Sequence, residues 1–210
     1  MAARHSKELK SVLREYINKP GTAGEKLRLR LQATSVESRL NLLKNVKGDS
    51  GYTGLHGAAL KNDLETMKSM LQDFTWEQKY DVAKIRSSFN YTAVHLAAHH
   101  GCSPIITYLL TDFSQQQRYD VLKMQCDDGA TPLHDAALKQ QGEVIHTILT
   151  LLTAQQQIQL LNITNKEGKK VPDIRPELHK EVTVLISQGV VEFYVLSHIF
   201  CRFFYRFIQV

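Results

Sequence analysis

The sequence predicts an all-α solenoid of about four stacked helical repeats joined by short projecting turns. The motif Thr-x-x-His-x-Ala-Ala begins at Thr53, Thr92 and Thr131, with the same spacing of 39 residues both times. Apolar residues recur in a constant register after each copy, as expected for stacked repeats. Of the 210 residues, 43% are apolar and 22% are charged. This composition supplies a buried core and excludes disordered and fibrous proteins.

Each motif is interpreted as the start of a first helix. The threonine is expected to be the N-cap, with the histidine at the third helical position. Pro132 occupies the first helical position, where a missing N–H group leaves no hydrogen bond unmade. The alanine pairs, such as Ala97 and Ala98, are expected to let the next helix approach closely without a void.

Two further helices are expected in each repeat. The second has one apolar face, which the middle repeat builds from Ile106, Leu109 and Leu110. The third begins at a capping hydroxyl that is followed three residues later by glutamine, at Thr75 and Gln78, Ser114 and Gln117, and Thr153 and Gln156. Full repeats are therefore placed near residues 48–86, 87–125 and 126–164, within an array that covers residues 21–181.

The ends of the array are expected to be degenerate. Ser35 and the leucines after it resemble the third helix of a preceding repeat, and residues 1–20 are expected to form an N-terminal basic helix or a divergent cap. At the other end, residues 170–174 retain only part of the motif. The turn before each motif position carries a residue that tolerates positive φ, namely Gly51, Asn90, Gly129 and Gly168.

In these motifs the chain resembles the ankyrin-repeat family, whose Thr-Pro-Leu-His-x-Ala-Ala signature is matched in full at residues 131–137. The resemblance covers about residues 24–174 and implies an elongated, curved, ankyrin-like stack of helix pairs. The family's usual repeat is about 33 residues long, so we assign the excess to the third helix. The glycine that normally closes the first helix is present as Gly101 but is replaced by Asn62 and Gln140, which leaves the loop shape open there.

The resemblance implies a non-enzymatic adaptor or scaffold that binds another protein through the turn tips and the concave face. The residues that it assigns to partner contact are Asp49, Ser50, Tyr52, Leu60, Lys61, Ser88, Phe89, Tyr91, His99, His100, Asp127, Asp128, Ala130, Leu138 and Lys139. Tyr52, Phe89 and Tyr91 would form an aromatic rim, and such rigid aromatic surfaces concentrate binding energy. Packing against a neighbouring repeat is an equally weighted role for each of these three side chains.

The alternative function is a membrane-associated or polyanion-binding effector that uses the basic N-terminus and the apolar tail. Residues 1–48 carry eleven Lys or Arg against four Asp or Glu. No aromatic residue is interleaved with Lys26, Arg28 and Arg30 to stack on a base, so solvated helix faces are the preferred interpretation. Nucleic acid is not an expected partner.

No catalytic residues, metal site or cofactor are expected. His56, His95 and His134 occur once per repeat, so they are interpreted as structural caps that lie too far apart to share a metal ion. His99 and His100 are adjacent in sequence and lack a ligand at helical spacing. Neither an activated nucleophile nor a phosphate-binding loop is recognisable.

Cysteine usage and the first residues favour a cytoplasmic location, with nuclear and membrane-associated locations left open. Cys102, Cys126 and Cys201 do not form a disulfide framework, and residues 1–10 lack the apolar stretch of a secretory signal. Trp76 and Tyr80, four residues apart on the third helix, are expected to pack in the core.

Residues 182–210 form a hydrophobic C-terminal tail or cap, rich in aromatic and β-branched residues. Three interpretations stay open: a buried capping helix, a membrane anchor, and sequence that arises from an altered reading frame. Polar and charged residues such as Glu192 and Arg202 interrupt the apolar run, so the capping helix is favoured over the anchor.

Overall fold

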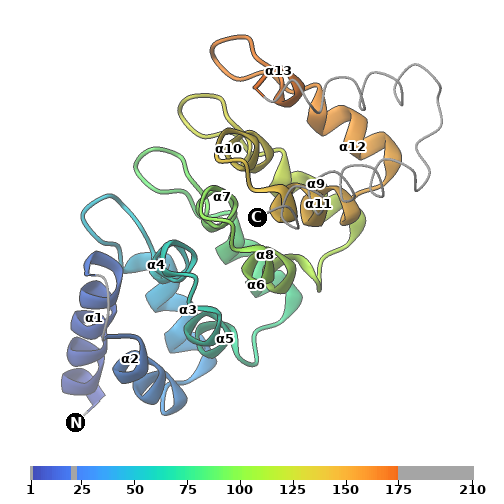
Figure 1. Ribbon diagram of the computed structural model, residues 1–210. Helices are drawn as coiled ribbons and strands as arrows, with labels where there is room; N and C mark the ends of the chain where they lie inside the picture. The colour runs from blue at the N-terminus through green and yellow to red at the C-terminus, as the bar shows by residue number, and fades with distance from the viewer. Residues whose placement is uncertain (1, 20–22, 175–210) are drawn as a thin grey trace, which may run out of the picture.

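The computed structural model describes residues 2–19 and 23–174, and within them the regular structure consists of 13 α-helices and one isolated β-bridge between Thr164 and Lys170. The helices form layers that are stacked along one direction (Figure 1). The predicted all-α repeat fold is therefore confirmed. The predictions for residues 182–210 lie outside the described residues.

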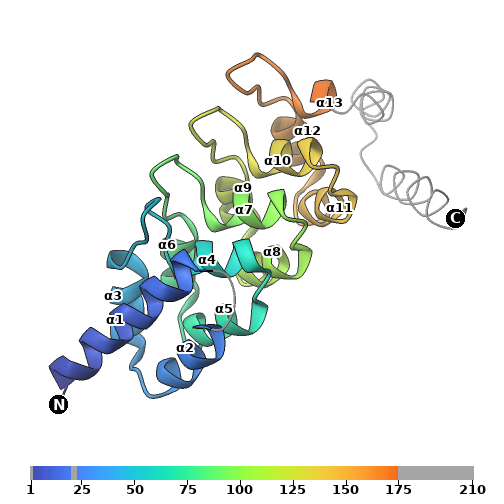
Figure 2. The ribbon, with the colours of Figure 1, turned by 60° about the vertical axis from the view of Figure 1, so that its left-hand side comes forward.

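The helices form three columns that run along the stack (Figures 1 and 2). The first column contains α1 (Ala2–Asn18), α4 (Gly54–Lys61), α7 (Ala93–His99), α10 (Pro132–Leu138) and α13 (Val171–Ile174). The second contains α2 (Ala23–Gln32), α5 (Leu64–Leu71), α8 (Ser103–Leu110) and α11 (Gly142–Thr150). The third contains α3 (Val36–Asn45), α6 (Trp76–Ala83), α9 (Gln115–Leu122) and α12 (Ala154–Leu161). A layer is thus one helix from each column, and α1, α2 and α3 make up the first.

The threonine and histidine of each motif form a reciprocal cap at the start of a first-column helix. In the middle repeat, the Thr92 N–H donates to Nδ1 of His95 over 3.2 Å, and the Thr92 hydroxyl lies 2.8 Å from the same nitrogen. The same contacts recur at Thr53 and at Thr131, each with its own histidine. Because Nδ1 accepts these hydrogen bonds, Nε2 carries the ring proton and faces the next repeat.

The alanine pairs of the first-column helices are buried where helices meet, and their small side chains let the helices approach closely, as the sequence predicts. Ala97 and Ala98 have no exposed surface, and Ile106 on the second helix is equally buried. One continuous apolar cluster extends from Leu9 in α1 to Val171 in α13. Each layer therefore covers the apolar face of its neighbour, which is the source of stability in a repeat protein.

The turns between layers project as fingers, defined as residues 48–52, 87–91, 126–130 and 165–169, and lie side by side (Figure 2). Each finger is closed by a main-chain hydrogen bond, such as the one from Ser87 N to Tyr91 O at 2.8 Å. Successive fingers are joined by the hydrogen bonds Ser88 N to Ser50 O, Asp127 N to Phe89 O and Lys166 N to Asp128 O. The predicted turn residues Gly51, Asn90, Gly129 and Gly168 all have positive φ, between 58° and 74°.

The loop that follows each first-column helix keeps one shape despite its different residues. Gly101, Asn62 and Gln140 have φ values of 75°, 52° and 57°, so all three adopt the left-handed conformation. The loss of glycine therefore changes the energy of the loop rather than its geometry. For residues with a Cβ this conformation is strained by about 1–2 kcal/mol.

We expect Gln140→Gly to stabilise the protein by about 0.5–1 kcal/mol, because glycine adopts positive φ without strain. The matched control is Gln155→Gly in α12, where helical backbone makes the same change destabilising by about 1 kcal/mol. Urea unfolding of both variants measures the two effects. Destabilisation by both replacements would contradict the strain at residue 140.

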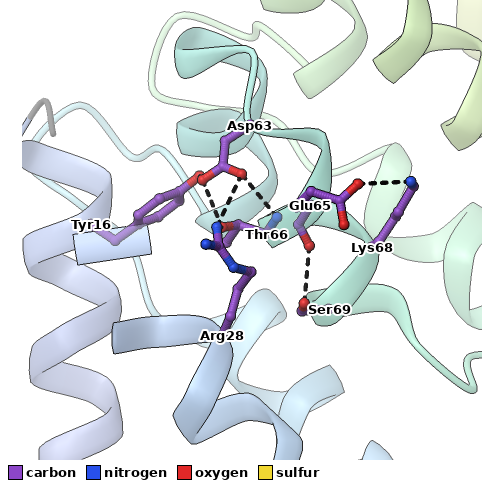
Figure 3. A network of polar contacts seen from close by, with 7 residues as sticks. All are labelled: Tyr16, Arg28, Asp63, Glu65, Thr66, Lys68 and Ser69. Atoms are coloured by element: carbon purple, nitrogen blue, oxygen red, sulfur yellow. Dashed lines mark hydrogen bonds and ion pairs between the residues drawn. The ribbon is translucent and has the colours of Figure 1, made fainter. Parts of the chain in front are cut away.

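The first layer is attached to the second by a polar network (Figure 3). Asp63 is the N-cap of α5 and accepts hydrogen bonds from Thr66 N at 2.9 Å and from the Tyr16 hydroxyl at 3.1 Å. Arg28 donates to the Thr66 hydroxyl over 3.0 Å and lies 3.6 Å from Asp63. Burial alone would raise the pKa of Asp63, but these hydrogen bonds and Arg28 lower it below its usual value.

One predicted core residue is at the surface. Trp76 is 48% exposed, so the prediction that it packs in the core is wrong. Trp76 is the first residue of α6, whereas the buried residues of this helix, Val82 and Ala83, lie at its other end. Tyr80, one turn later, does pack as expected, with its ring edge-on to Phe113 at a centroid distance of 5.4 Å.

Candidate protein-binding site

The predicted contact residues all reach the surface of the fingers and of the first column. Eight are exposed: Asp49, Ser88, Phe89, His100, Asp127, Asp128, Leu138 and Lys139. Seven are half-buried: Ser50, Tyr52, Leu60, Lys61, Tyr91, His99 and Ala130. Their assignment to partner contact stays a prediction, but their surroundings differ along the stack.

The three aromatic residues of the predicted rim have different surroundings. Tyr52 stacks on His56 with a centroid distance of 5.5 Å, and Tyr91 lies edge-on to His95 at 5.7 Å. Burial raises the pKa of both tyrosines. Phe89, at the tip of its finger, is 54% exposed. Phe89 therefore offers most of its ring to a partner, whereas the two tyrosines support the capping histidines.

At the N-terminal end of the site, α1 occupies part of the predicted surface. The ammonium of Lys61 lies 4.7 Å from the ring centroid of Tyr16 and 3.5 Å from the carbonyl oxygen of Ile17. Burial lowers the pKa of Lys61 below its usual value, while Asp63 opposes the shift. Leu60 packs against the core. In this layer the exposed residue among the predicted contacts is Asp49, which lies on the finger.

Five of the predicted residues meet in one pocket of about 460 Å³ toward the C-terminal end. These residues are Tyr91, His99, Asp128, Ala130 and Leu138. The remaining wall includes Asp135 of α10, Lys166, Glu167 and Lys169 of the last finger, and Asp173 and Ile174 of α13. We call this the C-terminal pocket.

Asp135 is the unusual residue of the C-terminal pocket. It is 5% exposed, and its Oδ2 atom accepts no hydrogen bond. Burial raises its pKa to about 7, the negative charge of Asp128 adds to the shift, and the positive charge of Lys139 opposes it. The equivalent residues of the other two motifs are Gly57 and Leu96. A charge at this variable motif position was the sequence signal for Asp135, and the prediction missed it.

The histidines have the surroundings expected of caps. Burial lowers the pKa of His56 to about 4 and that of His95 to about 3, although hydrogen bonds to main-chain carbonyl groups oppose the shift. Both rings are therefore neutral at physiological pH. Burial also lowers the pKa of His99, with further lowering by Lys139 and His100.

Two kinds of site are absent from residues 2–19 and 23–174. No group of three or more His, Cys, Asp or Glu side chains in this part of the chain is arranged to hold a metal ion. None of the helices described above combines the length and the apolar character that crossing a membrane requires.

Comparison with known proteins identifies the family. The family model for ankyrin repeats (3 copies) matches residues 55–160, which is about half of the chain. These residues contain the second and third motifs, the first motif from Leu55 onward, and the two fingers between the motifs. No curated protein matches the sequence. The chain therefore belongs to the ankyrin-repeat family.

Proposed function

We propose that this protein is a non-enzymatic adaptor or scaffold that binds another protein through its fingers and the C-terminal pocket. Ankyrin repeats generally mediate protein–protein interactions, and the family is typically non-enzymatic. The observation that carries the proposal is the C-terminal pocket itself, where five predicted contact residues lie together. We place the protein in the cytoplasm, in keeping with the free thiols of Cys102 and Cys126.

Two exposed apolar side chains support the proposal that the binding partner is a protein. Leu138 is 62% exposed at the edge of the pocket, and Phe89 is 54% exposed on a neighbouring finger. Aromatic and aliphatic anchors can form the buried centre of a protein interface, where a few side chains supply most of the binding energy. The charged residues around them would form the polar rim.

The polyanion-binding alternative is less well supported by the basic segment. Arg30 pairs with Glu8 at 2.9 Å and Lys44 pairs with Asp81 at 3.3 Å, while Arg28 lies near Asp63. Arg39 is 4% exposed and donates to the carbonyl oxygen of Gln72. These bases stabilise the first layer, which leaves fewer of them to bind phosphate groups.

We expect the double replacement Phe89→Ala with Leu138→Ala to reduce recovery of the protein's partners by at least about tenfold, because losing two interface anchors costs several kcal/mol. Affinity purification with quantitative mass spectrometry measures the recovery. Leu29→Ala is the matched control, since Leu29 is also 62% exposed but lies on α2. Equal recovery by the wild type, the double variant and the control would refute the proposed binding surface.

A further inference from the structure

We propose that the C-terminal pocket receives an arginine side chain of the partner protein, whose guanidinium group pairs with the carboxylate of Asp135. This inference rests on the proposed function, because it specifies the chemistry of the partner at the same surface. Its basis is a buried carboxylate that the fold leaves without a partner, in the wall of an open pocket.

The carboxylate of Asp135 is buried without a partner among the described residues. Asp135 lies on α10 between His134 and the alanine pair, and 95% of its surface is covered. Neither of its oxygens takes part in a hydrogen bond or ion pair with the described residues. A buried charge is ordinarily paired, because desolvation without compensation is expensive. The described residues thus leave Asp135 able to accept a donor that a partner protein supplies.

The residues that line the pocket carry more negative than positive charge. Asp128 and Asp173 line it together with Asp135, and none of the three forms an ion pair within the described part of the chain. Lys169 is paired with Glu167 at 2.9 Å, which balances both charges of that pair, and Lys166 in the wall offsets one of the three aspartates. The lining residues thus keep an excess of negative charge. The wall therefore favours a cation and repels phosphate groups.

The aromatic and apolar walls of the pocket favour arginine over other cations. The pocket has an aromatic wall at Tyr91 and apolar walls at Leu138 and Ile174, against which the methylene groups of a long side chain can pack. A guanidinium group is planar, stacks on aromatic rings and binds a carboxylate through two parallel hydrogen bonds. It is also less strongly hydrated than an ammonium group, so it enters a partly buried site at lower desolvation cost.

The pocket is large enough for one arginine side chain. A pocket of about 460 Å³ falls in the range of small-ligand pockets, roughly 300–1,000 Å³. It accommodates one arginine side chain together with part of the main chain that carries it. Phe89 and Leu138, both exposed nearby, would then contact the residues that flank this arginine.

The test uses the full chain and a small probe, Nα-acetyl-arginine methylamide, in an NMR titration that follows backbone amide shifts. We expect saturable shifts with millimolar affinity, concentrated in residues 126–138 and 165–174. The probe Nα-acetyl-citrulline methylamide has nearly the same shape without the charge and should bind at least about tenfold more weakly, since a charge-assisted pair is lost. Equal shifts with both probes, or no shifts of these residues with arginine, would overturn the proposal.

Two variants assign the binding to the carboxylate. Asp135→Asn should weaken binding of the arginine probe at least about tenfold. Asp128→Asn, at an exposed position, should weaken this binding about twofold to threefold. The matched control is Asp127→Asn, because Asp127 neighbours Asp128 but is bonded to the side chain of Asn90 and does not line the pocket. Unchanged affinity in Asp135→Asn also overturns the proposal.

The partner-recovery experiment separates this inference from the proposed function. If Phe89 and Leu138 are required for recovery but Asp135→Asn recovers the partner as well as wild type, the arginine inference fails and the adaptor function stands. If recovery is independent of all three residues, the proposed function fails at this surface. Loss of recovery in both the Phe89→Ala/Leu138→Ala double variant and Asp135→Asn, with Asp127→Asn unchanged, supports both.

Discussion

Replacing His95 with alanine is expected to lower the free energy of unfolding by about 3–4 kcal/mol, which is a large effect for a single residue. The ring has no exposed surface, and it accepts the hydrogen bonds of both the Thr92 N–H and the Thr92 hydroxyl. Its Nε2 atom lies 3.2 Å from the carbonyl oxygen of Ala130 in the next finger. The replacement leaves the buried Thr92 N–H without its acceptor, at about 1–3 kcal/mol, and leaves a cavity where the ring was packed. It also removes the link to the next finger, although Ala130 O keeps its hydrogen bond from Cys126 N.

Urea unfolding followed by circular dichroism measures this effect at neutral pH, where the ring is neutral in the folded protein. The control is His100→Ala, because His100 is exposed and its ring makes no cap. We expect the control to change the free energy of unfolding by less than about 0.5 kcal/mol, as surface replacements do. A loss below about 1 kcal/mol for His95→Ala would contradict the cap and the link between layers.

The second large effect is a gain of stability that depends on pH. Asp135→Asn is expected to stabilise the protein by about 2–3 kcal/mol more at pH 8 than at pH 5, given that one pKa unit corresponds to about 1.4 kcal/mol. In the wild type, burial and Asp128 raise the pKa of Asp135 to about 7, above the ordinary value of 3.8. The folded state therefore binds a proton more tightly than the unfolded state. That stabilising contribution is present at low pH and is lost as pH rises from about 4 to 7.

Asparagine does not titrate, so the variant escapes this loss. The difference in unfolding free energy between the variant and the wild type, measured from pH 5 to pH 8, isolates the contribution of Asp135. The capping histidines titrate in both proteins and cancel in this difference. Asp127→Asn, at an exposed position, is the control for replacing a carboxylate by an amide. A constant difference for Asp135→Asn would show that the carboxylate is not destabilised by burial.

Much of the fold could be predicted from the sequence, because it is encoded by short-range interactions. The capping hydroxyls at Thr75, Ser114 and Thr153 accept hydrogen bonds from residues three positions later, as predicted. The periodic apolar residues specified which face of each second helix is buried. The sequence left the shape of the loops at Asn62 and Gln140 open, and the structure shows that both residues adopt the left-handed conformation of Gly101.

The parts of the site that were missed depend on contacts between layers. The Nε2 atom of His56 lies 2.9 Å from the carbonyl oxygen of Tyr91, 35 positions along the chain, and no local pattern reports that contact. The pocket around Asp135 is likewise formed by α7, α10, α13 and the intervening fingers. Desolvation of a carboxylate depends on all of these elements together, so only the assembled stack shows it.

The hydrogen bonds between fingers have a mechanical consequence. They connect successive layers along the edge that carries the pocket, and the histidine contacts reinforce the same edge. The helices α3, α6, α9 and α12 of the third column touch one another more sparsely than the helices of the first column do. We therefore expect the stack to bend about the fingers. The spacing between the binding residues would then stay constant, while the spacing between helices of the third column changes.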